Sequence, residues 1–136
     1  MPSATTSSEP IRVLLADDNE AMIVRAAAAL APGCVVVGAA RDGRAALEAV
    51  LTLDHDVVVL DIGMPHMTGL EVASRLRQTG SRSAVVFLTV YDDEALIEAA
   101  RLAGGLGYVV KPRLQVDLGA AVRDALAGLE VVSPRG

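Results

Sequence analysis

The sequence predicts a doubly wound, five-stranded parallel α/β sheet with five helices, and three observations support this. Short apolar segments alternate with longer amphipathic segments five times along the 136 residues. The apolar segments are rich in Val and Leu and lack a strict polar alternation, which is typical of strands covered on both faces. The connections are short and no internal repeat is present, which favours one domain wound strand–helix–strand.

The five strands are expected at residues 11–16, 34–39, 57–60, 84–89 and 106–110. Residues 1–10 are polar and rich in Ser and Thr, so we expect a flexible lead before the first strand. Residues 11–129 form the predicted domain, and residues 130–136 are expected to be a tail or the start of a linker.

Each predicted helix has a local signal at its start or along one face. The first is expected from about residue 19 to residue 30, and the second starts near Asp42. Thr68 and Glu71 have the spacing of a capping box at the start of the third helix, and the fourth begins in the acidic segment 92–94. The apolar faces of the second and fifth helices comprise Ala46, Leu47, Val50, Leu51 and Leu114, Leu118, Ala121, Val122, Ala125, Leu129.

Composition excludes several classes of protein. The net charge of −5 and the presence of only three aromatic residues argue against a nucleic-acid-binding surface on this chain. One Cys and two His exclude a disulfide framework and a structural zinc site. The longest apolar stretch, residues 26–40, is broken by Pro and Gly and falls short of the roughly 20 residues of a membrane helix. Since no signal-peptide pattern is present, we expect a cytoplasmic protein without a membrane partner.

Polar side chains follow four of the five predicted strands. The first strand ends in Asp17 and Asp18, the third in Asp61, the fourth in Thr89 and the fifth in Lys111. The second strand is expected to contribute no ionisable group immediately at its end. Because parallel strands place their carboxyl ends at one edge of the sheet, a strand order of 2-1-3-4-5 brings the acidic side chains together at the point where the winding direction switches.

Each of these residues also has an ordinary structural explanation. Asp18 can cap a helix, Thr89 suits a strand, and a lysine suits the surface. Asp61 is harder to explain in this way, because it follows four apolar residues that should be buried, and an ionised carboxylate there needs a partner. The coincidence at four strand ends therefore favours a functional site.

Three neighbouring carboxylates repel one another and favour a hard divalent cation such as Mg²⁺. Their charge of −3 is balanced by Mg²⁺ together with Lys111, so the site could accept an approaching phosphoryl group. Asp61 would be the nucleophile of an in-line attack that forms an acyl phosphate. The metal, Lys111 and the hydroxyl of Thr89 would stabilise the equatorial oxygens.

At these positions the chain resembles a receiver domain of the two-component response-regulator family, whose fold is flavodoxin-like. The resemblance covers residues 11 to about 129 and is carried by the motifs VLLADDN (13–19), DIGMPHMTG (61–69), LT (88–89) and GYVVKP (107–112). It implies that Asp61 accepts a phosphoryl group from a sensor histidine kinase. It also implies that Asp17, Asp18, Asp61 and the carbonyl of Gly63 hold Mg²⁺.

The resemblance further implies a conformational switch. Thr89 would move toward the phosphoryl group while the ring of Tyr108 turns inward, and the peptide between Lys111 and Pro112 is a candidate for the cis isomer. The output surface would be the fourth helix, fifth strand and fifth helix, through which two copies could form a homodimer. Such a protein catalyses its own phosphorylation and dephosphorylation without being a conventional enzyme.

The resemblance is closest to receivers that precede a LuxR/NarL-type helix-turn-helix. It therefore implies control of transcription through a DNA-binding domain outside this sequence, and the last residues resemble the start of a linker. The alternative is a stand-alone receiver that acts by protein–protein contact or in a phosphorelay.

Two residues after Thr89 bear on access to the phosphoryl site. Val90 is β-branched where many receivers have Ala, so it narrows the entrance. Tyr91 and Gly63 occupy the variable positions beside the path of a hydrolytic water. We expect the Tyr91 ring to shield the acyl phosphate and lengthen its life.

Two other readings are disfavoured by the residues present. Phosphatases of the haloacid-dehalogenase type need a second Asp two residues after the nucleophile, where this chain has Gly63. A flavodoxin-like FMN module needs a loop rich in hydroxyl groups after the first strand, where this chain has Asp17, Asp18 and Glu20.

Overall fold

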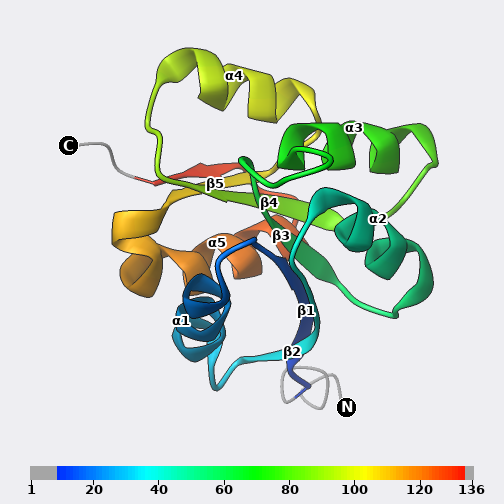
Figure 1. The fold of residues 1–136 in the computed structure, drawn as a ribbon. Coiled ribbons are helices and arrows are strands. Elements are labelled where there is room, and N and C mark those ends of the chain that lie inside the picture. Colours follow the sequence, from blue (N-terminus) through cyan, green and yellow to red (C-terminus); the bar gives the residue numbers. More distant parts are fainter. Residues whose placement is uncertain (1–8, 134–136) are drawn as a thin grey trace.

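A computed structural model of the chain describes residues 9–133 and contains one parallel sheet in the order β2-β1-β3-β4-β5-β6 (Figure 1). The predicted fold class and the order 2-1-3-4-5 are therefore confirmed, with one short strand added at the β5 edge. The strands are β1 (Ile11–Ala16), β2 (Cys34–Ala40), β3 (Val57–Asp61), β4 (Ala84–Thr89), β5 (Gly107–Val110) and β6 (Val131–Val132).

Five helices cover the two faces of the sheet. They are α1 (Glu20–Leu30), α2 (Gly43–Thr52), α3 (Gly69–Gln78), α4 (Glu94–Leu102) and α5 (Leu114–Leu126). Helices α2, α3 and α4 lie on one face and α1 and α5 on the other, as Figure 1 shows. None of the helices in this described part is long and apolar enough to cross a membrane.

The core consists of two aliphatic layers separated by the sheet. All five residues of β3 are buried, as expected for a central strand covered on both faces. Its residues alternate between the layers: Val58 and Leu60 face α2, α3 and α4, while Val57 and Val59 face α1 and α5. Phe87 and Tyr108 are buried in the first layer, and most of the other core residues are Val, Leu and Ala.

The predicted helix starts are confirmed by their caps. The Asn19 side chain accepts hydrogen bonds from two amides of α1, and the side chains of Asp42 and Asp93 each accept one at the start of α2 and α4. At α3 both halves of the capping box are present, with Thr68 and Glu71 bonded to each other's backbone amides. Helix α5 instead continues from a 3₁₀ turn over Lys111–Arg113.

Some sequence expectations differ from the structure near the end of the chain. Helix α5 ends at Leu126 because Gly128 adopts a positive φ of 83°, so Leu129 leaves the apolar face and is 56% exposed. Val131 and Val132, expected in the tail, form β6. On α2, Leu51 is also 56% exposed, because the buried face of that helix is narrower than its apolar stripe.

The peptide between Lys111 and Pro112 is trans, so the expectation of a cis isomer there is wrong. Pro112 lies within the 3₁₀ turn that leads into α5, a position whose backbone a trans proline readily adopts. The described cis peptide joins Ala31 and Pro32. Residues 1–8 of the expected lead and residues 134–136 of the expected tail lie outside the described residues.

Gly43 generates a stability prediction because it is the point of closest approach between α2 and the loop after β3. Its amide donates to the carbonyl of Pro65 at 3.3 Å, and a Cβ at this position would lie 1.8 Å from the carbonyl oxygen of Met67. Helix propensity alone predicts that Gly43→Ala stabilises α2 by about 1 kcal/mol. We expect instead a loss of about 1–3 kcal/mol, the usual range for overpacking, measured by urea unfolding.

Gly33→Ala is the matched control, because nothing lies within 4 Å of a Cβ built there and its φ is not positive. We expect this variant to unfold at the wild-type urea concentration or slightly above it. A Gly43→Ala variant as stable as the Gly33→Ala variant would contradict the close packing of α2 on the β3–α3 loop.

Candidate functional site

The acidic residues predicted at the strand ends lie together at the carboxyl edge of the sheet. Asp17 follows β1 and Asp61 ends the neighbouring strand β3, and their side chains are almost completely buried, with 3% and 6% of each residue exposed. Asp18 is exposed at the rim. One carboxylate oxygen from each of the three residues lies within 4.8 Å of the other two, and no second acidic or metal-ligating group of this kind occurs within residues 9–133.

Lys111 is the cation of the cluster. Its Nζ lies 2.9 Å from Oδ2 of Asp17 and 3.4 Å from Oδ2 of Asp61, and only 11% of its side chain is exposed. Burial by itself would lower the pKa of Lys111, but the close contact with Asp17 and the negative charges of Asp61 and Asp17 raise it overall. The ammonium group therefore stays charged and belongs to the cluster.

The charged form of Asp61 is less well stabilised than the neighbouring lysine suggests. Burial and the neighbouring charge of Asp17 raise the pKa of Asp61, and the opposing effects of Lys111 and of the Gly63 amide, which donates to Oδ1 at 3.2 Å, do not compensate. The carboxylate is thus held in a place where further positive charge would be favourable.

The backbone around the cluster is fixed by short-range contacts. The backbone amide of Asn19 donates a hydrogen bond to Oδ1 of Asp17 at 2.9 Å, so the start of α1 orients this carboxylate. A Cβ on Gly69 would lie 2.4 Å from the carbonyl oxygen of Asp61, and the Gly69 amide donates to the carbonyl of Ile62. Glycine at the start of α3 therefore lets that helix approach the end of β3 closely.

Arg41 was not predicted to lie at this edge. Strand β2 extends to Ala40, one residue further than expected, so Arg41 directly follows it and the expectation that this strand end carries no ionisable group is wrong. Its Nε and Nη2 each donate to the carbonyl oxygen of Asp18 at 3.3 Å, and its Nη1 lies 3.4 Å from Glu20. The sequence signal that could have identified Arg41 was its charge at a strand end, but the predicted end of β2 was one residue too early.

The residues expected to act as a switch are joined through the loop after β4. Thr89 is buried, and its hydroxyl oxygen accepts a hydrogen bond from the Tyr91 amide at 3.3 Å. The ring of Tyr108 is directed inward, 3% exposed, and its hydroxyl donates to the carbonyl of Tyr91 at 2.8 Å. Val90 and the Tyr91 side chain are each 60% exposed. One short loop therefore links Thr89 on β4 to Tyr108 on β5.

The cluster fits a hard divalent cation. Oδ2 of Asp17 is buried and accepts no hydrogen bond from the described residues, since Lys111 approaches it as an ion pair without hydrogen-bond alignment. Carboxylate oxygens of this kind are the protein ligands that Mg²⁺ prefers, and it retains water in its remaining positions. The donor set, the buried Asp17 oxygen that accepts no hydrogen bond and the incomplete charge compensation are thus consistent with the expected metal.

Comparison with known families and proteins agrees with the fold. The family model of the response regulator receiver domain matches residues 13–123. The nitrate/nitrite response regulator protein NarP of Escherichia coli (strain K12) is 36% identical over 137 aligned positions, covering 99% of this chain and 62% of the relative. The probable transcriptional regulatory protein NarL of Mycobacterium tuberculosis (strain ATCC 25618 / H37Rv) is 34% identical, covering 93% and 59%. The chain therefore spans about three fifths of these curated relatives.

Solved structures give the same result. The signal receiver domain of the putative response regulator NarL from Mycobacterium tuberculosis superposes with a TM-score of 0.81 at 33% identity, covering 88% of this chain and 98% of that one. A two-component response regulator of the LuxR family from Aurantimonas sp. SI85-9A1 gives a TM-score of 0.87 at 28% identity, covering 93% and 91%. This chain thus belongs to the response regulator receiver domain family of two-component signalling proteins, and its relatives are of the NarL and LuxR type.

Proposed function

We propose that the chain accepts a phosphoryl group on Asp61 and uses it to control an output surface. The observation that carries the proposal is the placement of Asp61, a buried carboxylate 3.4 Å from the Nζ of Lys111 and clustered with two further carboxylates. A structural ion pair would need one carboxylate and one lysine. The excess negative charge instead suits a site that gains positive charge and a phosphoryl group when it works.

The reaction is the transfer of a phosphoryl group from a phosphohistidine of a sensor histidine kinase. An oxygen of the Asp61 carboxylate attacks phosphorus in line, a new P–O bond forms, and the P–N bond to the histidine ring breaks. The imidazole leaves as a neutral ring because its second nitrogen retains a proton. Lys111 contacts a developing equatorial oxygen with its ammonium group, and the hydroxyl of Thr89 donates a hydrogen bond to another.

Asp17, Asp18 and Asp61 would hold Mg²⁺, together with the carbonyl of Gly63. The cation supplies positive charge that offsets the charge of the carboxylates and of the incoming phosphoryl group. Asn19 keeps Asp17 oriented for this role, and Arg41 fixes the backbone of Asp18.

Phosphorylation would act on the surface formed by α4, β5 and α5 through Thr89 and Tyr108. A two-state shift in this surface would change its affinity for a second copy of the chain or for another domain. Relatives named as transcriptional regulators support an output in transcription, exerted in the cytoplasm through a DNA-binding domain outside this sequence.

The first prediction concerns phosphorylation itself. After incubation with Mg²⁺ and a small phosphodonor such as acetyl phosphate, the intact mass should increase by one phosphoryl group. Asp61→Asn should remove this increase, because an amide oxygen is a poor nucleophile. Asp124→Asn, which removes a carboxylate of α5 outside the cluster, is the matched control and should still gain the group. No mass increase in the wild-type protein would refute the proposal.

The second prediction concerns the repulsion between the buried carboxylates of Asp61 and Asp17. Without Mg²⁺, Asp61→Asn should raise the thermal midpoint by about 3–5 °C, the shift that 1 kcal/mol produces in a domain of roughly this size. The reason is that the amide removes one of the buried charges that burial and Asp17 disfavour. Circular dichroism at a fixed wavelength measures it.

Mg²⁺ should reduce the difference between the two thermal midpoints. At a Mg²⁺ concentration ten times its Kd, the wild-type protein gains about 1.4 kcal/mol in its free energy of unfolding, whereas the variant binds Mg²⁺ more weakly and gains less. Asp124→Asn again serves as the control and should shift neither midpoint. A variant less stable than the wild-type protein in both conditions would mean that Asp61 is a structural carboxylate.

The third prediction concerns the lifetime of the acyl phosphate. Tyr91→Ala should increase the rate of dephosphorylation severalfold, since the exposed ring no longer screens the site from water. The carbonyl that holds Tyr108 belongs to the backbone and remains in the variant. Tyr91→Phe retains the ring and should dephosphorylate at the wild-type rate. Equal rates for Tyr91→Ala and the wild-type protein would show that the side chain does not shield the site.

A further inference from the structure

Strand β6 covers the open edge of β5, the strand that contains Tyr108. The amide of Val131 donates to the carbonyl of Leu106, and the amide of Ser133 donates to the carbonyl of Tyr108, each at 2.8 Å. In this parallel pairing Val132 lies opposite Tyr108. The end of the described chain is thus bonded directly to the backbone of the residue expected to switch.

A side-chain anchor supports this two-residue strand. Ser133 is 3% exposed, and its hydroxyl donates to Oδ2 of Asp117 on α5 at 2.5 Å. The same carboxylate oxygen accepts from Nε of Arg113 at 2.9 Å, and Arg113 lies two residues after Lys111. The β6 segment, defined as residues 130–133, is therefore attached to both β5 and the start of α5.

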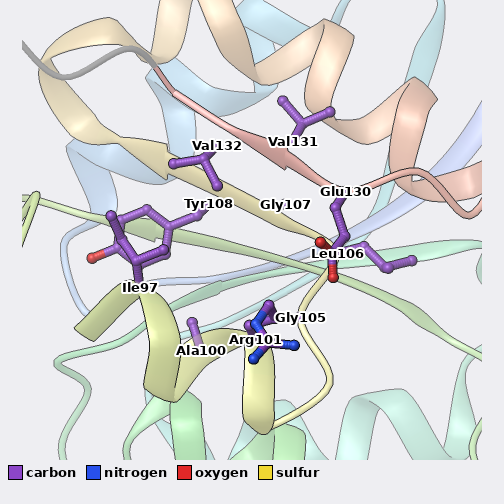
Figure 2. A pocket seen from close by; sticks show the side chains of 10 residues that line it. All are labelled: Ile97, Ala100, Arg101, Gly105, Leu106, Gly107, Tyr108, Glu130, Val131 and Val132. Atoms are coloured by element: carbon purple, nitrogen blue, oxygen red, sulfur yellow. The ribbon is translucent and has the colours of Figure 1, made fainter. Parts of the chain in front are cut away.

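Val132 lies beside the Tyr108 ring on the same face of the sheet. Opposite residues of paired strands present their side chains to one face, and Figure 2 shows Val132 next to the ring, with Ile97 of α4 nearby. The ring lies on the side of the sheet covered by α4, so Val132 stands between it and the open edge.

The space beside the ring is too small to receive it. The cavity between α4, β5 and β6 is lined by Tyr108, Ile97, Ala100 and Val132 among others and has a volume of about 40 Å³. A protein cavity that holds a benzene ring measures roughly 150 Å³. With α4 and β6 in place, this pocket therefore cannot hold the phenol ring.

We propose that the β6 segment is a positioning element that holds the Tyr108 ring in its inward orientation. Val132 lies beside the ring, and Ser133 keeps Val132 in place through its hydrogen bond to Asp117. The Tyr108 hydroxyl is bonded to the loop after Thr89 and the Tyr108 carbonyl to β6, so this residue connects the two. Such coupling is reciprocal: whatever favours the inward ring also favours docking of the β6 segment.

The link to phosphorylation rests on the function proposed above. If a phosphoryl group on Asp61 draws Thr89 and the Tyr108 ring inward, it also tightens the β6 segment on the domain. Release of the segment would in turn weaken the phosphorylated conformation. Docking of β6 would then depend on whether Asp61 is phosphorylated, although β6 pairs with β5 and not with β3.

Tyrosine fluorescence tests the positioning role without phosphorylation. The chain has no Trp and two Tyr, so Tyr91→Phe leaves Tyr108 as the remaining fluorophore. In that background Val132→Gly should raise the acrylamide quenching constant of Tyr108 about twofold or more, since a coupling of ordinary size shifts a two-state ratio at least fivefold. Val132→Ile should keep the quenching constant low, because it retains a branched side chain beside the ring.

The matched control is Val35→Gly on β2, the opposite edge of the sheet, where the valine is 42% exposed compared with 47% for Val132. This variant should leave the quenching constant unchanged. Ser133→Ala provides a second test, because loss of the Asp117 anchor should raise the constant in the same direction. Equal quenching in the Val132→Gly, Ser133→Ala and Val35→Gly variants would overturn the proposal.

Hydrogen exchange with a parallel intact-mass measurement tests the link to phosphorylation. In protein that has gained one phosphoryl group, the amides of Val131 and Ser133 should exchange more slowly than in unmodified protein. Unchanged exchange in protein shown by mass to be phosphorylated would overturn the link while the proposed function stands. Absence of any mass gain would instead refute the proposed function, and the fluorescence result would still decide the positioning role.

Discussion

Three carboxylates are held at one edge of the sheet against the ammonium group of Lys111, and the fold around them is arranged to keep this imbalance in place. Two of the carboxylates are buried, so solvent cannot screen their repulsion. The fully buried β3 fixes Asp61, and the close approach of α3 at Gly69 fixes the loop after it. The stability of the surrounding aliphatic layers is what allows a locally unfavourable arrangement of charge to persist.

Helices α4 and α5 are packed against the sheet to different extents. Helix α5 buries five residues against the sheet, whereas Ala100 is the one buried residue of α4 among those described. Fewer buried contacts mean that less free energy is needed to displace a helix. Of these two helices, α4 therefore needs less free energy to shift, while α5, which carries Asp117, is the more firmly packed.

The features that could be predicted from the sequence depend on local chemistry or on the general geometry of parallel sheets. Burial on both faces explains the apolar strands and made Asp61 conspicuous, and capping explains helix starts such as that at Thr68. The missed features depend on contacts between distant segments. Nothing in two consecutive valines near the end of the chain reveals their pairing with β5, and Arg41 became recognisable only once β2 was known to reach Ala40. The hydrogen bond from the Tyr108 hydroxyl to the Tyr91 carbonyl likewise depends on tertiary packing.

The parallel direction of β6 also sets where the described chain comes to an end. A parallel strand runs toward the carboxyl edge, so Ser133 points to the same edge of the sheet as Asp61, whereas β1 begins at the opposite edge. Any protein or label fused after this strand would therefore continue from the β6 side of the sheet, in the direction of the edge that holds Asp61. A fusion at the other terminus would be attached to the far edge, which makes that terminus the better place for a tag or a surface tether.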